Sequence, residues 1–212
     1  MRLDKKIKAE YERSNLSTVR PLFVTPIFSR NLSGFEQLVS VVKNLRQNDK
    51  GKIKSNIGGW HSEENLHENQ DFLLLRDKIL NFSTNAFKYA AVSDDFTPVI
   101  TNMWAIINRP GDYNRSHMHQ NNYLSGVFYL KIPHNSGSLV FFDPRPQAEV
   151  ISPPKTENEP INLSSLVNWD PKENDLIIFP SWLRHEVEIN TSAEDRIVVS
   201  FNIAYREQRR NQ

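Results

Sequence analysis

The stretch Ser116-His117-Met118-His119-Gln120 leads into the apolar run Tyr123-Leu124-Ser125-Gly126-Val127-Phe128-Tyr129-Leu130, and the two together decide how this chain folds. The run combines aromatic and apolar side chains over eight positions, which predicts a β-strand. On a strand, residues i and i+2 point to the same face, so His117 and His119 would present two imidazoles together. Two imidazoles on one face, joined by a third such as His185, are the sequence form of a mononuclear metal site.

Composition limits the classes of protein that this chain can belong to. The 212 residues are enough for one domain with a buried core, and the net charge of +1 argues against a dedicated nucleic-acid binder. The chain has no cysteine, so any metal must be bound by His, Asp, Glu or water. A signal-peptide pattern and a membrane-length apolar run are both missing, and we therefore expect a soluble, cytoplasmic protein.

The order of apolar patterns predicts helices first and strands afterwards. Apolar residues recur at helical spacing over about 33–46 and 69–91. Residues 21–28 look like a short strand bounded by prolines. From Phe96 onward, short β-rich runs alternate with turn signals, and no helical pattern separates them; these runs are 99–108, 123–132, 138–142, 176–179, 185–189 and 196–205. The sequence therefore predicts a mainly β fold with N-terminal helices (α+β), in which antiparallel strands form a jelly roll or cupin-like sandwich around a cavity.

The domain organisation follows from the same patterns. Residues 21–205 are expected to form a single domain, preceded by a flexible arm over 1–20 and followed by a tail over 206–212. The stretch 144–169 is rich in Pro, Asn and Ser and is too long for a tight hairpin, so it is a candidate functional loop.

The histidines differ in what their neighbours indicate. His134 lies in a turn and His67 in a charged stretch, and both are expected to be solvated, whereas His61 could reach a cavity. Taken alone, His117 and His119 are equally well explained as exposed strand residues, and His185 as a partly buried histidine without a ligand.

Arg196 begins an otherwise apolar strand, where a buried guanidinium needs an anionic partner. Its planar fork matches a carboxylate, so one interpretation is a clamp for a carboxylate ligand inside the sandwich. The other is an arginine at the edge of the sheet with its head group in water.

The ordered set of these motifs resembles the iron(II)- and 2-oxoglutarate-dependent oxygenases, and most of all a group common in bacteria and marine phages that is related to prolyl hydroxylases. The resemblance covers about 21–205 and rests on Trp104, Asn108-Arg109-Pro110-Gly111, His117-x-His119, the run 124–130, Phe142-Asp143-Pro144-Arg145, Phe179-Pro180-Ser181-Trp182-Leu183-x-His185 and Arg196 through Asn202.

The resemblance implies a double-stranded β-helix with helices packed outside it, and an Fe(II) ion bound by an H-x-D/E…H triad. His117 and His185 match the two histidine positions, while His119 stands where the carboxylate is usual. The catalytic and metal-binding residues implied are therefore His117, His119 and His185, with Asp112 or Asp143 as the alternative source of a carboxylate.

The resemblance also implies 2-oxoglutarate and O2 as co-substrates, with succinate and CO2 as co-products of a hydroxylation. It places Arg196 on the distal carboxylate of 2-oxoglutarate and Tyr129 beside it. Ser200 and Asn202 share the face of Arg196 by period two and could line the same cavity. Trp182, Arg145 and the stretch 144–169 are candidates for a substrate rim.

The primary substrate is not named by the sequence. A prolyl or other peptide residue is one candidate, and a homodimer is an open alternative to a monomer. Two other functions compete with the oxygenase: a cupin-like three-histidine metalloenzyme that does not use 2-oxoglutarate, and a metal-free jelly-roll binding module.

Overall fold

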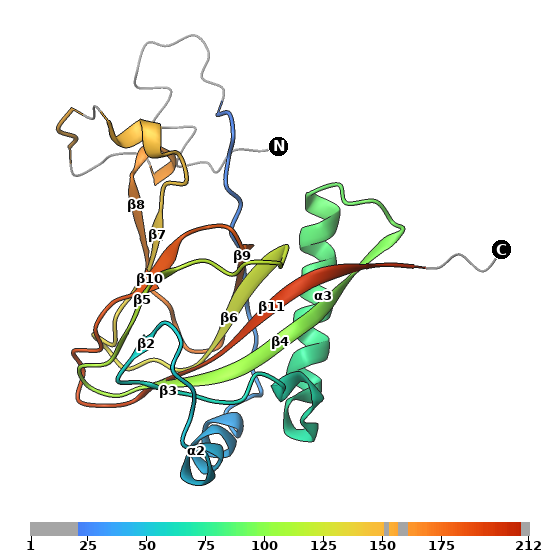
Figure 1. The fold of residues 1–212 in the computed structure, drawn as a ribbon, viewed down its shortest axis with the longest axis vertical. Helices are drawn as coiled ribbons and strands as arrows, with labels where there is room; N and C mark the ends of the chain where they lie inside the picture. Colours follow the sequence, from blue (N-terminus) through green and yellow to red (C-terminus); the bar gives the residue numbers. More distant parts are fainter. Residues whose placement is uncertain (1–20, 151–152, 157–160, 209–212) are drawn as a thin grey trace.

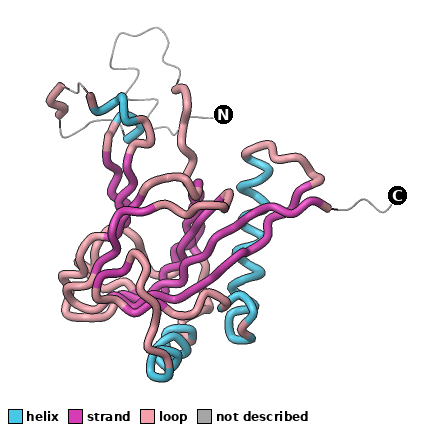
Figure 2. Tube along the Cα trace, in the orientation of Figure 1, coloured by secondary structure: helices cyan, strands magenta, loops and turns pink. Residues whose placement is uncertain are grey.

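Two antiparallel sheets face each other, and helices cover the outer side of the larger sheet (Figures 1 and 2). The computed structural model describes residues 21–150, 153–156 and 161–208. The expected arm over 1–20 and the last residues of the expected tail lie outside the described residues. The six-stranded sheet has the order β1 (Phe28–Asn31), β9 (Asp175–Pro180), β6 (Leu124–Lys131), β11 (Arg196–Glu207), β4 (Phe96–Asn108) and β3 (Trp60–His61).

The smaller sheet carries five strands, with the order β2 (Asn56–Ile57), β5 (Tyr113–His117), β10 (His185–Val187), β7 (Leu139–Phe142) and β8 (Leu166–Trp169). Two α-helices, α2 (Leu38–Asn48) and α3 (Leu73–Tyr89), precede the long strands, and four short 3-10 helices complete the described elements: η1 (Leu66–Glu68), η2 (Gln70–Phe72), η3 (Pro146–Glu149) and η4 (Ile161–Leu163). The prediction of a mainly β fold with N-terminal helices and two facing sheets is confirmed.

The two faces of the larger sheet bury different sets of side chains, because successive residues of a strand point to opposite faces. Along β11, Ile197, Val199 and Phe201 pack on the helix side, in one core cluster with side chains of α2 and α3. Val198, between them, packs on the opposite side in a second cluster that both sheets share. The strands are apolar on both faces because the helices cover one face and the smaller sheet covers the other.

The helices are shorter than the sequence pattern suggests. The first expected helix, 33–46, is observed as α2 from Leu38, because Gly34 takes a φ of +88°, which a right-handed helix excludes. The second, 69–91, begins as α3 only at Leu73, since Asn69 is extended and its side chain accepts a hydrogen bond from the Asp71 backbone N–H. Ala90, expected on the buried face, is exposed at the end of α3.

Other boundaries also differ from expectation. Residues 21–27 are not strand: Pro26 has no N–H to donate to a sheet, Phe23 has a φ of 55°, and β1 begins at Phe28. The stretch 144–169 is not wholly irregular, since it contains η3, η4 and the edge strand β8. At the other end, β11 continues through Arg206 to Glu207, inside the expected tail. Within the described residues, no helix has the length and apolar character to cross a membrane.

Gly126 lies at the centre of β6, opposite Phe201 of β11, and allows the helix-side core to close. A β-carbon at this position would overlap the Phe201 ring and would lie 2.5 Å from the Ile177 carbonyl oxygen. The carbonyl belongs to the neighbouring strand β9 and cannot move without breaking the sheet.

We expect Gly126→Ala to lower the free energy of unfolding by about 3 kcal/mol, near the upper end for overpacking of a core. Urea denaturation would measure it. The matched control is Gly111→Ala, where φ is +88° but no atom lies within 4 Å of the new β-carbon. The free energy of unfolding of the control should fall by only about 1 kcal/mol, which is the cost of placing alanine in a left-handed backbone conformation. A loss at Gly126 no larger than that at Gly111 would contradict the steric account.

Candidate active site

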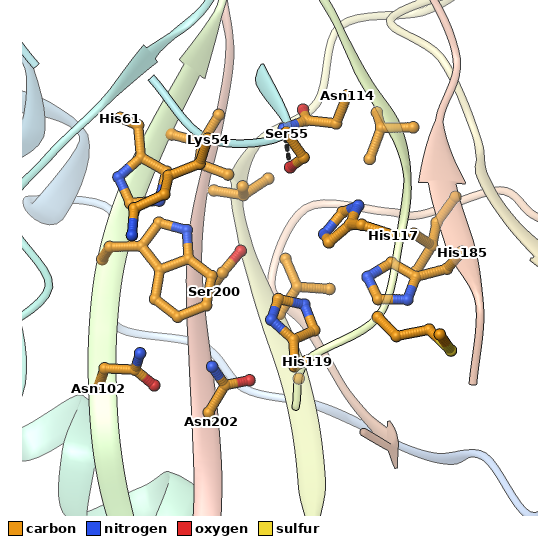
Figure 3. A pocket seen from close by; sticks show the side chains of 18 of the residues that line it. Lys54, Ser55, His61, Asn102, Asn114, His117, His119, His185, Ser200 and Asn202 are labelled. Carbon is orange, nitrogen blue, oxygen red and sulfur yellow. Dashed lines mark hydrogen bonds between the residues drawn. The ribbon is translucent and has the colours of Figure 1, made fainter. Parts of the chain in front are cut away.

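A cavity of about 630 Å³ opens between the two sheets (Figure 3). Seven residues that the sequence singled out come from different elements and line it together: His117, His119, Tyr129, His185, Arg196, Ser200 and Asn202. Side chains from both sheets meet in this cavity, so chemistry is expected here rather than on the outer surface.

His117 and His185 face each other across neighbouring strands. His117 ends β5 and His185 begins β10, and the two are direct partners in the antiparallel register, with ring centroids 4.4 Å apart. The Nδ1 atom of His117 lies 2.7 Å from the Arg115 carbonyl oxygen, and that of His185 lies 2.8 Å from the Leu183 carbonyl oxygen. Because a carbonyl only accepts, both Nδ1 atoms must donate, and each Nε2 keeps its lone pair for a metal.

His119 completes the group by a different route. It lies just beyond the end of β5, not on the strand, and its backbone N–H donates to the Ser181 carbonyl oxygen at 3.0 Å. One nitrogen from each of the three imidazoles lies within 4.8 Å of the other two. No described residue hydrogen-bonds to the His119 ring, which is held instead by ring contacts with Trp104, His117 and His185.

Burial keeps the three imidazoles uncharged. It lowers the pKa of His185 to about 3, with a further contribution from the neighbouring His117, and lowers the pKa of His119 to about 4. Burial also lowers the pKa of His117, against the effect of its hydrogen bond to Arg115. Neutral imidazoles are the form that binds a metal ion, so none of the three needs to lose a proton to bind one at neutral pH.

The two carboxylates considered as alternative ligands are engaged elsewhere. Asp112 accepts hydrogen bonds from the backbone and side chain of Arg109, and Asp143 binds the side chain of Arg145. Neither lines the cavity. Among the described residues, no Asp or Glu joins the three histidines in a cluster with metal-binding distances.

Arg196 and Tyr129 form the cationic part of the cavity. Arg196 is 2% exposed, and its Cζ lies 5.5 Å from the centre of the Tyr129 ring. Neither the Arg196 Nε nor the Tyr129 hydroxyl has a hydrogen-bond partner of good geometry, and no described carboxylate pairs with the guanidinium. Burial lowers the pKa of Arg196 and raises that of Tyr129. A buried cation without a partner is costly, so this part of the cavity is suited to an anion.

Ser200 and Asn202 follow Arg196 on the same face of β11, as period two requires. Figure 3 shows Ser200 and Asn202 beside the cavity. Asn202 is 3% exposed, and its side-chain oxygen accepts a hydrogen bond from the Ser125 hydroxyl at 2.7 Å. The strand rise of about 3.4 Å per residue places Asn202 roughly 20 Å along the strand from Arg196. The two residues therefore serve different parts of the cavity.

Sequence reasoning gave little weight to His61, which the structure places in the cavity. His61 is 3% exposed and stacks on Trp104 with ring centroids 5.4 Å apart and an interplanar angle of 8°. Trp104 in turn contacts His119, at a centroid distance of 5.8 Å. Asn102, two residues before Trp104 on β4, lines the cavity as well. The sequence could have predicted that Asn102 lines the cavity, because Asn102 lies two residues before Trp104 and so shares its strand face. Nothing local in the sequence indicates that His61 is buried.

The candidates for a substrate rim are not at the cavity. Trp182 is 51% exposed and does not line it, and Arg145 binds Asp143. None of the described residues of 144–169 lines it either. The segments that do contribute beside the sheets are those around Lys54, Ser55 and Glu64 and the stretch from Arg115 to Asn122.

Comparison with known proteins agrees with this geometry. Residues 102–202 match the family model described as "Putative 2OG-Fe(II) oxygenase". This segment is similar to the domain of that family. The matched segment includes the three histidines and Arg196, and this match supports an oxygenase of the class that uses Fe(II) and 2-oxoglutarate. None of the curated proteins compared matches the chain.

Solved structures of such oxygenases share the fold. A prolyl-4-hydroxylase from Pseudomonas putida is 14% identical, with a TM-score of 0.59 over 85% of this chain and 92% of that one. A prolyl hydroxylase from Trichoplax adhaerens, solved with a peptide fragment, is 15% identical, with a TM-score of 0.56 over 95% and 94%. The epimerase SnoN of nogalamycin biosynthesis, solved with Fe3+ and alpha ketoglutarate, is 12% identical, with a TM-score of 0.62 over 96% and 85%. At these identities the likeness establishes the double-stranded β-helix fold.

The donor groups of the cavity fit Fe(II) and 2-oxoglutarate. Three neutral imidazoles suit iron in a nitrogen-rich site, although imidazole replaces the more usual carboxylate and leaves the ion's full charge uncompensated. A dicarboxylate would offset that charge and that of Arg196 at once. The buried Arg196 guanidinium, which lacks a carboxylate partner among the described residues, is the observation in this structure that favours a dianionic co-substrate.

We expect His117→Ala and His185→Ala each to weaken binding of Fe(II), or of Mn(II) in its place, more than about 100-fold, because each removes an anchored ligand. Titration calorimetry under anaerobic conditions would measure it. His134→Ala is the matched control, since His134 is exposed in a turn. His119→Asp should still bind metal, because a carboxylate restores the usual ligand type. Unchanged affinity in both alanine variants would exclude this metal site.

We expect the metal-free protein to lose stability as the pH falls from 7 to 5. A buried histidine has a lower pKa in the folded protein than in the unfolded chain, so the unfolded chain takes up a proton more readily. The stability that the neutral histidine contributes is therefore present above about pH 6.5 and is lost as the pH falls below it. His185, with a pKa of about 3, should account for roughly 2 kcal/mol over this interval. Urea denaturation at the two pH values would measure it, and His185→Gln should show a smaller dependence. A pH dependence identical in the variant would contradict the assignment.

Proposed function

We propose that this protein hydroxylates a C–H bond of an organic substrate, with Fe(II) bound by His117, His119 and His185 and with 2-oxoglutarate bound through Arg196. In the balanced reaction, substrate, O2 and 2-oxoglutarate give hydroxylated substrate, succinate and CO2. The observation that carries the proposal is the placement of a buried guanidinium, which no described carboxylate pairs, in the same cavity as a cluster of three neutral imidazoles.

Different residues of the cavity have different roles in the proposed reaction. The bound iron would supply the oxygen chemistry that couples decarboxylation of 2-oxoglutarate to oxidation of the C–H bond. His117 and His185 hold their Nε2 atoms in place through the Nδ1 hydrogen bonds to backbone carbonyls, so metal binding needs no change of tautomer. Phe179 packs edge-on against His185, with ring centroids 4.8 Å apart, and shields that side of the site from water.

Arg196 would orient the co-substrate through its distal carboxylate, and the Tyr129 hydroxyl would donate a second hydrogen bond to that group. Both residues are anchored in the centre of the larger sheet, where β11 pairs with β6 through Val198 and Tyr129. A fixed carboxylate at this end determines where the other end of the molecule meets the metal site. Ser200 and Asn202 as co-substrate contacts stay a prediction, and their position along β11 favours the primary substrate instead.

A peptide residue, such as a prolyl residue, is the finer proposal for the primary substrate. Its support is the likeness of the fold to prolyl hydroxylases, one of them solved with a peptide fragment. A direct test would incubate the Fe(II)-loaded protein with 2-oxoglutarate and proline-containing peptides. Succinate would be followed by NMR and the peptide by mass spectrometry, where the expected gain is one oxygen atom.

One observation favours a second function. Because no described carboxylate joins the three histidines, the ligand set equals that of a cupin-like three-histidine metalloenzyme that works without 2-oxoglutarate. The two functions differ in the role of Arg196, which such an enzyme would not need. Absence of 2-oxoglutarate binding in the metal-loaded protein would therefore favour the second function.

We expect Arg196→Met to raise the dissociation constant of 2-oxoglutarate about 100-fold or more, because the variant keeps the volume of the side chain and removes the buried charge. The absorption band of the anaerobic Fe(II)–2-oxoglutarate complex would report binding. Arg184→Met is the matched control, since Arg184 is exposed and lies over the Phe142 ring, with its Cζ 4.4 Å from the ring centre. Metal affinity should be unchanged in both variants. Equal 2-oxoglutarate affinity in wild type and Arg196→Met would refute the clamp.

A further inference from the structure

The cavity has a second polar region that neither the metal site nor the anion clamp uses. It is formed by His61, Asn102, Ser200 and Asn202, which we call the neutral subsite (Figure 3). Trp104 lies between His61 and His119 and so connects the subsite to the histidine cluster. A substrate bound here would therefore lie beside the metal site.

His61 presents a fixed hydrogen-bond acceptor to this region. Its Nδ1 lies 2.7 Å from the Ser62 carbonyl oxygen and must donate to it, which leaves the lone pair on Nε2. No described residue donates to this Nε2, and the stack on Trp104 holds the ring in one plane. Burial lowers the pKa of His61, so the ring stays neutral at physiological pH.

Asn102 and Asn202 present donors. They are direct partners across β4 and β11, so their side chains leave the sheet together. The Asn202 oxygen accepts from the Ser125 hydroxyl at 2.7 Å. The Thr101 hydroxyl lies 3.1 Å from the Asn102 oxygen and 2.7 Å from the Asn122 oxygen, so its single proton favours Asn122. The NH2 groups of Asn102 and Asn202 can donate, and no described residue accepts from them. The Ser200 hydroxyl, opposite Trp104 in the register, is also unpaired.

The charge of the region limits what it can bind. Among the described residues that line the cavity, Lys54 and Glu64 pair with each other at 3.1 Å, Arg115 is exposed, and Arg196 lies at the far end of the β11 face. Lys54 and Glu64 lie close enough to His61 to affect its pKa, but they pair with each other, so a charged group at the neutral subsite would have no free counter-charge and burying it would be unfavourable. An uncharged substrate with an acceptor near the two asparagines and a donor near His61 could pair with their NH2 groups and with the His61 Nε2 atom.

We propose that the neutral subsite recognises uncharged amide groups of the primary substrate. The NH2 groups of Asn102 and Asn202 donate to an amide carbonyl, and His61 Nε2 accepts from an amide N–H. This inference rests on the proposed function, because it names the substrate chemistry of the same cavity. It excludes free amino acids, whose ammonium and carboxylate groups are both charged.

The test uses the full chain loaded with Zn(II) and 2-oxoglutarate, which gives a diamagnetic complex that does not turn over. The probe is N-acetyl-L-alaninamide, a neutral diamide, and L-alanine is its charged counterpart. Side-chain NH2 signals of Asn102 and Asn202, assigned by their absence in Asn102→Ala and Asn202→Ala, report contact by 15N NMR. Two further probes distinguish a peptide substrate from a small-molecule substrate. A capped tetra-alanine peptide represents the first, and the lactam 2-pyrrolidinone represents the second.

We expect the diamide to shift both NH2 signals and L-alanine to shift neither at the same concentration. His61→Phe, which keeps the stack on Trp104, and Asn102→Ala should each bind the diamide about tenfold more weakly, since each leaves one hydrogen bond of the amide unmade. Exposed His134→Phe and Asn44→Ala are the matched controls and should bind as wild type does. Tighter binding of the tetrapeptide would assign the site to peptides, and tighter binding of the lactam to small amides.

The inference is overturned if L-alanine binds as well as the diamide, or if both His61→Phe and Asn102→Ala bind the diamide with wild-type affinity. Affinities for Zn(II) and 2-oxoglutarate are measured in the same samples. If both bind and no probe moves the NH2 signals, the neutral subsite is wrong and the proposed function stands. If neither metal nor 2-oxoglutarate binds, the proposed function itself is wrong.

Discussion

The alternation of side chains along β11 is the constraint on which the rest of this protein depends. Every second residue of the strand faces the helices and closes the main core, and the residues between them face the smaller sheet. Arg196 stands at the start of the cavity-facing series and Asn202 near its end. A slip of one residue in the pairing with β4 or β6 would exchange the two sets, burying the polar groups against helices and exposing the core to the cavity.

The same pairing rule builds the metal site from the opposite sheet. His117 and His185 are brought together because β5 and β10 are neighbours in register, and backbone carbonyls fix the tautomer of both rings. His119, outside the strand, lacks such a fixed partner. The protein thus combines two imidazoles oriented by backbone hydrogen bonds with one that is positioned by ring packing alone.

Electrostatics separates the cavity into regions of different chemistry. Arg196 is a buried cation without a counter-ion, the histidine cluster is neutral until a metal arrives, and His61 and the two asparagines carry no charge at all. A dianion is drawn to the guanidinium and the metal together, and a neutral substrate is left with the remaining polar region. In such a cavity, a ligand is rejected when its binding would leave a buried charge or hydrogen-bonding group without a partner. This rejection contributes to specificity as much as the favourable contacts do.

The sequence by itself determined the class of fold and most of the candidate site. Period-two patterns from Phe96 onward predicted the strands, and His117, His185 and Arg196 stood out because their residue types were unusual for their places. What only the tertiary structure decided depends on contacts between distant segments. His61 lines the cavity because β3 pairs with β4. Asp112 and Asp143 are not available as metal ligands because Arg109 and Arg145, respectively, form hydrogen bonds with them. Local patterns cannot show such contacts, since strand pairing and burial are set by the whole sheet and not by neighbours in the chain.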